Sequence, residues 1–224
     1  MANFILPPSL YDVFLESVHF GTPEDARHTI TYHLNGPPQA VTKAKRSLSH
    51  VLAKIISLRK RELLDLLLEP IVEHGVPIIG NAVKAAAALP LDEATYYLDA
   101  LFALGWDVNE PISNAEPPVL RYAMLKRVII DLTVYSLALH NISLVRWLLK
   151  KGADPNAPAD IDYSALSIAV SRSKFRTVKL LLEHAQHSHN GHLVYYATLR
   201  DDPKEAMRMI KLVYKYNKPI DDIL

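Results

Sequence analysis

The sequence contains no cysteine among its 224 residues. Without thiols the chain forms no disulfide, no thiolate metal site and no cysteine nucleophile. A protein without disulfides is compatible with a reducing compartment, so we expect it to act in the cytoplasm or the nucleus.

Long apolar runs are also missing, because no stretch approaches the ~20 apolar residues that a membrane-spanning helix needs. The segment Met1–Leu10 lacks a basic region followed by an apolar one, which predicts no secretory signal. Half of the residues are hydrophobic, 22% are charged and the formal net charge is +1. This balance predicts a folded chain with no general affinity for nucleic acid or for membranes.

Motifs that carry catalysis are absent from the sequence. It has no Gly-x-Ser-x-Gly elbow, no His-Glu-x-x-His helix, no phosphate-binding glycine loop and no dinucleotide fingerprint. The carboxylate pairs Asp201-Asp202 and Asp221-Asp222 are adjacent in sequence and are explained by helix capping. We therefore predict that the chain is not an enzyme and binds no cofactor and no metal.

Glycine is scarce, with seven residues, and its positions are informative. Three glycines end a leucine-rich segment in similar contexts: Gly75, Gly105 and Gly152. A helix commonly stops at a residue in the left-handed region, which glycine reaches without a steric clash. Weaker marks of the same kind are Gly36, Ala185 and Asn217. Successive marks are separated by 39, 30, 47, 33 and 32 residues, which indicates a repeat of about 33 residues.

The segments before these marks have the pattern of short amphipathic helices. Apolar residues recur at helical spacing in 63–68, 145–149 and 178–182. Helix starts are indicated by Thr22-Pro23 and by Asp202-Pro203, each of which combines a capping residue with a proline. Such helices bury their apolar faces only by stacking on neighbouring repeats.

The segment 141–183 resembles the ankyrin repeat consensus. Val145–Ala157 is similar to the second helix and the hairpin start of that family, and Ser164–Val170 stands where the family has its Thr-Pro-Leu-His helix start. Gly105–Asn109 and Pro118–Met124 repeat these two features. The segment 191–221 is similar to divergent repeats of filamentous fungal ankyrin proteins.

The resemblance implies an all-α ankyrin-repeat solenoid of about six helix-pair repeats with short hairpin loops. We expect one ankyrin-repeat domain over 1–224, with a divergent N-terminal repeat in 1–36 and the clearest repeats in 98–221. The 47-residue interval implies roughly 14 extra residues relative to a 33-residue period, and we expect 128–139 to form a lengthened, buried first helix. Arg121 and Ser167 replace the family's histidine, which predicts the loss of its hydrogen-bonded turn.

The resemblance also implies that protein partners are bound by the hairpin tips and the first helices. On this sequence the predicted partner-binding residues are Trp106, Glu110, Ser113, Asn114, Glu116, Lys126, Asp160, Ile161, Tyr163, Ser171 and Arg172. Trp106 is the first candidate anchor, because tryptophan often anchors interfaces; the alternative is that its ring packs locally. Trp147 lies on a leucine-rich face and is predicted to be core.

These residues predict a protein-binding scaffold or adaptor that is monomeric and whose partner is not identified by the sequence. The alternative is a small-molecule-binding protein or an enzyme that uses a pocket in the irregular region 106–140. Four histidines between His184 and His192 are interpreted as a polar loop rather than a metal site. The basic runs 43–46 and 59–61 are interpreted as solvated helix, because no aromatic residues interleave with them and Glu62 and Asp65 follow at once.

Overall fold

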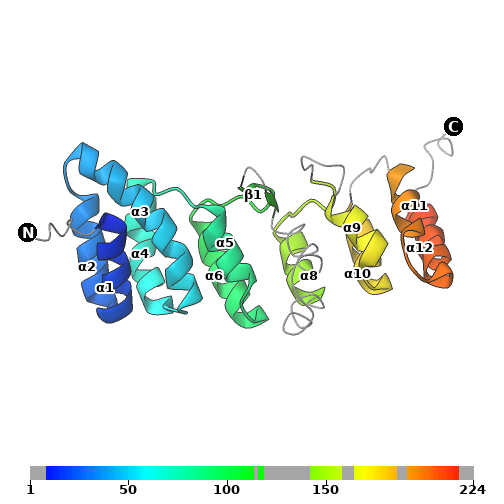
Figure 1. The fold of residues 1–224 in the computed structure, drawn as a ribbon, viewed down its shortest axis with the longest axis horizontal. Coiled ribbons are helices and arrows are strands. Elements are labelled where there is room, and N and C mark those ends of the chain that lie inside the picture. Colours follow the sequence, from blue (N-terminus) through cyan, green and yellow to red (C-terminus); the bar gives the residue numbers. More distant parts are fainter. Residues whose placement is uncertain (1–8, 114–115, 119–141, 158–163, 186–190, 217–224) are drawn as a thin grey trace, which may run out of the picture. The chain divides into compact units, whose positions relative to one another are not determined.

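The computed structural model describes residues 9–113, 116–118, 142–157, 164–185 and 191–216 (Figure 1). It divides into two compact units, Met1–Asp107 and Val108–Leu224, which are described one at a time below. The prediction of a single repeat domain across the whole chain stays a prediction.

The first unit is built from three helix pairs. They are α1 (Leu10–Phe20) with α2 (Pro23–Leu34), α3 (Pro38–Ser57) with α4 (Arg61–His74), and α5 (Gly80–Ala87) with α6 (Leu91–Ala103). The first helices α1, α3 and α5 pack side by side, and the second helices α2 and α4 pack beside each other (Figure 1). The core lies between the two layers and contains Phe14, Ile30, Leu48, Leu64 and Tyr97, each with an exposed fraction of 0%.

Capping residues in the sequence explain where helices α1 and α2 begin. Ser9 caps α1 and Thr22 caps α2, and in both cases the acid three residues later completes a capping box. The Thr22 hydroxyl accepts from the Asp25 backbone N–H at 3.1 Å. Each box satisfies two backbone donors that have no partner inside the helix. The predicted start at Thr22-Pro23 is confirmed.

Glycine ends three helices in the left-handed region, as predicted. Gly75, Gly105 and Gly152 have φ angles of 59°, 92° and 89°. No atom lies within 4 Å of a Cβ built on any of them, so the backbone angle, and not crowding, favours glycine there. The weaker mark Ala185 is wrong as a left-handed cap, because its φ is −73°. Asn217 lies outside the described residues.

Arg59, in the turn between α3 and α4, occupies the left-handed region without being glycine. Its φ is 56°, and its side chain pairs with Glu93 of α6. A side chain in this region strains the backbone by about 1–2 kcal/mol, and an exposed ion pair stabilises the folded state by about 0–1 kcal/mol, which offsets only part of that strain. Nothing in the local sequence pattern predicts this conformation for an arginine.

We expect Arg59→Val to lower the free energy of unfolding of the first unit by about 1–2 kcal/mol, because β-branched residues fit this region worst. The matched variant Arg59→Gly removes the same ion pair but relieves the backbone, so its change is expected to stay within about 1 kcal/mol. Urea unfolding measures both. An equal loss in the two variants would show that the contact with Glu93, and not the backbone, is what matters.

The second unit begins with a short hairpin and continues with helices. Strands β1 (Pro111–Ser113) and β2 (Glu116–Pro118) are antiparallel, with Pro111 opposite Pro118 and Ser113 opposite Glu116. The helices are α8 (Ile142–Lys150), α9 (Ala165–Arg172), α10 (Phe175–His184), α11 (Gly191–Thr198) and α12 (Pro203–Tyr216). First helices α9 and α11 pack together, and second helices pack in the order α8, α10, α12 (Figure 1).

The described residues therefore contain five helix pairs and α8, and the predicted all-α repeat fold is confirmed. The start of α12 at Pro203, predicted from Asp202-Pro203, is confirmed as well. The expected long helix in 128–139 lies outside the described residues. None of the described helices is both long enough and apolar enough to cross a bilayer.

The turn before α9 corrects one expectation from the sequence. Ser164 caps α9 and accepts from the Ser167 backbone N–H at 3.1 Å, while the two hydroxyl oxygens lie 3.0 Å apart. Serine at the histidine position thus rebuilds a hydrogen-bonded turn, and the predicted loss of that turn at Ser167 is wrong. The second such position, Arg121, lies outside the described residues.

Trp147 is half-buried, so the prediction that it belongs to the core is wrong. The buried face of α8 is formed by Leu144, Val145, Leu148 and Leu149. Trp147 lies at the margin of that face, and the Lys151 ammonium stands 5.4 Å from its ring centroid. A large ring beside a cation at the edge of the core is stabilised without full burial.

Candidate functional site

The first candidate anchor, Trp106, is buried, with an exposed fraction of 6%. It follows Gly105 directly, and its backbone N–H donates to the Leu101 carbonyl at 3.1 Å, which closes the end of α6. This placement corresponds to the alternative of local packing that the sequence left open. A role for Trp106 in an interface stays a prediction.

Two of the predicted partner-binding residues are exposed on the described surface. Glu110 lies just before β1, and Arg172 lies at the C-terminal end of α9. Ser171, next to Arg172, has an exposed fraction of 7%, and its hydroxyl donates to the Ile168 carbonyl at 2.9 Å. Ser113 and Glu116 face each other across the hairpin. The remaining predicted residues lie outside the described part of the chain: Asn114, Lys126, Asp160, Ile161 and Tyr163.

An asparagine side chain joins two successive loops of the second unit. The Asn109 carboxamide donates to the Gly152 carbonyl at 3.0 Å and accepts from the Asp154 backbone N–H at 2.8 Å. The Asp154 carboxylate in turn accepts from the Asn156 backbone N–H at 2.8 Å. Sequence reasoning missed this tie, although the similar spacing of Gly105 to Asn109 and Gly152 to Asn156 was its signal.

We expect Asn109→Ala to lower the free energy of unfolding of the second unit by about 1–3 kcal/mol, since it leaves two backbone groups without a partner. Hydrogen exchange at the Asp154 amide is the direct measurement, and that amide is expected to exchange faster. Asn109→Asp keeps the acceptor and loses the donor, so it should protect the Asp154 amide while still costing stability. Unchanged exchange in Asn109→Ala would contradict the tie.

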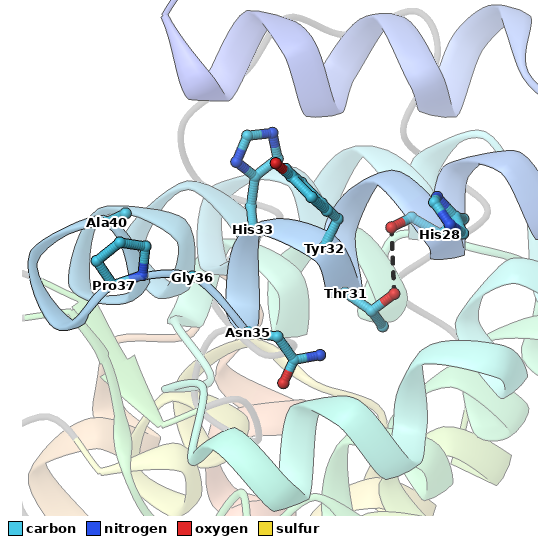
Figure 2. A pocket seen from close by; sticks show the side chains of 8 residues that line it. All are labelled: His28, Thr31, Tyr32, His33, Asn35, Gly36, Pro37 and Ala40. Atoms are coloured by element: carbon cyan, nitrogen blue, oxygen red, sulfur yellow. Dashed lines mark hydrogen bonds between the residues drawn. The ribbon is translucent and has the colours of Figure 1, made fainter.

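A pocket of about 650 Å³ opens where α2 ends and α3 begins (Figure 2). Two of its polar side chains, Thr31 and Asn35, form contacts inside the protein. The Thr31 hydroxyl donates to the Arg27 carbonyl at 2.8 Å, and the Asn35 side-chain oxygen lies 3.2 Å from the His74 Nε2 atom. Among its lining residues no nucleophile is paired with a base, so the geometry gives no indication of catalysis. The pocket is lined by His28, Thr31, Tyr32, His33, Asn35, Gly36, Pro37 and Ala40.

A polar seam connects the second helices α4 and α6. The Tyr96 hydroxyl donates to the Asp65 carboxylate, and the Arg61 guanidinium lies 4.7 Å from the Tyr96 ring centroid. Burial raises the pKa of Tyr96, and the bond to Asp65 and the charge of that carboxylate raise it further. The hydroxyl therefore stays a donor at every physiological pH, and the seam holds two repeats together.

Arg200, after α11, makes the corresponding connection in the second unit. Its Nε atom donates to the Val170 carbonyl at 2.9 Å, and its Nη2 atom donates to the Ser173 carbonyl at 2.6 Å and to the Ala169 carbonyl at 3.4 Å. These carbonyls lie at the end of α9, where a helix has acceptors without partners. Burial lowers the pKa of Arg200.

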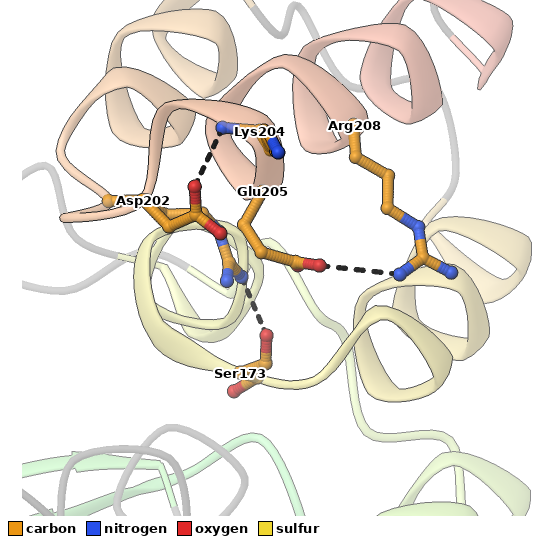
Figure 3. A network of polar contacts seen from close by, with 6 residues as sticks. Ser173, Asp202, Lys204, Glu205 and Arg208 are labelled. Carbon is orange, nitrogen blue, oxygen red and sulfur yellow. Dashed lines mark hydrogen bonds and ion pairs between the residues drawn. The ribbon is translucent and has the colours of Figure 1, made fainter.

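The start of α12 completes this network (Figure 3). The Asp202 carboxylate accepts from the Lys204 backbone N–H at 2.9 Å. Glu205 and Arg208 form an ion pair at 3.3 Å, and the Arg208 guanidinium lies 4.2 Å from the ring centroid of Phe175 on α10. The contact of Arg208 with Phe175 joins α12 to α10, whereas the other two contacts lie within the start of α12.

The predicted polar loop of histidines falls mostly outside the described residues, since 186–190 are not described. The His184 Nδ1 atom lies 2.9 Å from the Leu180 carbonyl of its own helix. Among the described residues no group of three His, Asp or Glu side chains is placed to hold a metal ion.

Comparison with known proteins identifies the repeats. A family model described as ankyrin repeats (many copies) matches residues 135–182, which include α8 and α9. No curated protein and no solved structure matches the chain. Residues 135–182 therefore carry ankyrin repeats, and the predicted resemblance is confirmed there. Ankyrin repeats generally mediate protein–protein interaction, and proteins of this family are typically non-catalytic binding modules. The fungal character of the repeats stays a prediction.

Proposed function

We propose that the chain is a protein-binding scaffold or adaptor that presents its hairpin loops and first helices to a partner without catalysis. The observation that carries this proposal is the tie made by Asn109, because it fixes successive loops before any partner arrives. A surface that is rigid in the free protein loses less conformational entropy on binding. Glu110 and Arg172 are the exposed predicted contact residues on this surface.

Several polar side chains take part in contacts between repeats, which supports a binding function over a catalytic one. Asp65 and Tyr96, like Arg200, are engaged in contacts between repeats. Catalytic groups need free, convergent positions around a substrate. We further propose that the protein acts in the cytoplasm or the nucleus, because a chain without cysteine depends on no oxidising environment.

A photo-crosslinking amino acid placed at single positions tests the proposed surface in cells. We expect Glu110 and Arg172 to capture the same protein partner. Arg176 on α10 and Met207 on α12 are exposed residues of second helices and serve as matched controls, with several times lower yield expected. Capture only from the control positions, or the absence of any captured protein at all four, would contradict the proposal.

A further inference from the structure

Helix α3 presents a row of basic side chains on one face. Lys43, Arg46 and His50 are exposed and Lys54 is half-exposed. The steps of three, four and four residues place all four on the same side of a helix. We call these four residues the basic stripe; at 1.5 Å per residue it is about 16 Å long.

Three cations of the stripe, Lys43, Arg46 and Lys54, have no carboxylate partner among the described residues. Arg59 pairs with Glu93, and Arg61 lies over Tyr96. In contrast, no described carboxylate lies within 4.0 Å of Lys43, Arg46 or Lys54. The stripe therefore offers charge that the described residues leave uncompensated.

Charge in the first unit is separated between the two helix layers. Helices α3 and α5 contain no aspartate or glutamate, and α5 adds the half-exposed Lys84 beside the small residues Ala85 and Ala88. The second helices α4 and α6 contain seven acids: Glu62, Asp65, Glu69, Glu73, Asp92, Glu93 and Asp99. Helices α3 and α5 pack side by side, so acidic residues are absent from both of these neighbouring helices.

The opposite edge of the first-helix layer is acidic but does not neutralise the stripe. Asp12 and Glu16 on α1 are exposed, and Asp12 is bonded to Ser9 in the capping box of its own helix. The positive surface is thus limited on one side by α1, and it has the length of a short peptide rather than that of an extended polymer.

We propose that the basic stripe binds an acidic peptide segment of a partner protein. Glutamates at helical spacing would match the steps of the stripe, and complementary charge favours both encounter and register. This proposal rests on the proposed protein-binding function and names a partner chemistry for it. The acidic-peptide proposal involves neither Glu110 nor Arg172. Peptide binding therefore tests the basic stripe, and cross-linking from Glu110 and Arg172 tests the proposed protein-binding function separately.

Nucleic acid fits the stripe less well than an acidic peptide. Single strands are held largely by bases that stack on aromatic side chains, and the stripe has no Phe, Tyr or Trp. Residues 1–107 contain twelve acids and nine Lys or Arg, which gives a net charge of −3. A long polyanion is repelled by such a unit, whereas a short acidic segment meets only the local positive surface.

Binding of a labelled twelve-residue peptide with glutamate at every third or fourth position, measured on the full chain by fluorescence anisotropy at low salt, tests this proposal. We expect Kd to rise about tenfold or more for Lys43→Glu/Arg46→Glu, because two attractive contacts become repulsive. The double variant Lys174→Glu/Arg176→Glu has the same change in net charge at other exposed positions and should stay within about twofold. The same peptide with glutamine for glutamate should not bind.

Circular dichroism establishes that the variants are folded, and Lys43→Gln/Arg46→Gln replaces the reversed pair if that variant is not. Three results would overturn the proposal: no binding of the glutamate peptide, equal weakening by the two double variants, or tighter binding of an equally charged single-stranded oligonucleotide that also depends on the stripe. The last result would identify a nucleic-acid surface. Cross-linking from Glu110 and Arg172 is independent of all three.

Discussion

The Tyr97→Ala variant is expected to lower the free energy of unfolding of the first unit by about 3–5 kcal/mol. Tyr97 has an exposed fraction of 0%, and its ring meets that of Tyr96 with centroids 5.1 Å apart. Truncation removes the buried ring and leaves a cavity that the packed helices fill only in part. Because repeat proteins can unfold in parts, hydrogen exchange along α6 should accompany the denaturant curve.

Tyr97→Phe is the matched control, and its effect is expected to be near zero or stabilising by up to about 1 kcal/mol. The Tyr97 hydroxyl is buried and makes no hydrogen bond of ordinary geometry, although burial raises its pKa and the nearby Arg61 guanidinium opposes that rise. Removing a buried polar group that bonds to nothing gives up no contact and relieves its desolvation. A loss above about 1.5 kcal/mol in Tyr97→Phe would reveal a bond to this hydroxyl and contradict the assignment.

Features of the fold that depend on adjacent residues were predictable from the sequence. The helix ends at Gly75, Gly105 and Gly152 follow from the backbone preference of one residue. The start at Thr22 follows from a hydroxyl and a carboxylate three residues apart. Both effects act within a single helical turn, so neighbouring repeats do not alter them.

Features that depend on contacts between repeats were not predictable. Asn109 bonds to groups more than forty residues away, and Arg200 bonds to carbonyls about thirty residues away. Trp147 has the spacing of a core residue, yet the edge of the packed face leaves it half-exposed. Periodicity states which residues share a face, but the neighbouring helix determines how far that face is covered.

The candidate sites show the same distinction. Their position within the repeat predicts both Ser171 and Arg172 as partner-binding residues, but only Arg172 is exposed. Lys43 and Arg46 of the basic run 43–46 are exposed, which agrees with its interpretation as solvated helix. The acids Glu62 and Asp65 follow the other basic run, 59–61. In the structure those acids belong to α4, and Asp65 accepts from Tyr96 rather than pairing with the stripe.

Arg200→Ala is expected to lower the free energy of unfolding of the second unit by about 2–4 kcal/mol. One guanidinium satisfies the carbonyls of Ala169, Val170 and Ser173, and hydrogen bonds from a charged donor contribute about 1.5–3 kcal/mol each before losses of rotamer freedom. Alanine removes the charged donor from these carbonyls, although the Ala169 carbonyl still accepts from the Ser173 backbone N–H at 2.7 Å. Denaturant unfolding with hydrogen exchange across α9 and α11 measures the effect.

Arg200→Lys separates charge from geometry. Lysine keeps the positive charge beside the helix end, but its single ammonium group cannot reproduce the forked contact of Nε and Nη2. We expect it to recover less than half of the loss. Full recovery by lysine would show that attraction to the helix terminus suffices, whereas a loss below about 1 kcal/mol in Arg200→Ala would show that water replaces the guanidinium. Either result would remove Arg200 as the connection between these two repeats.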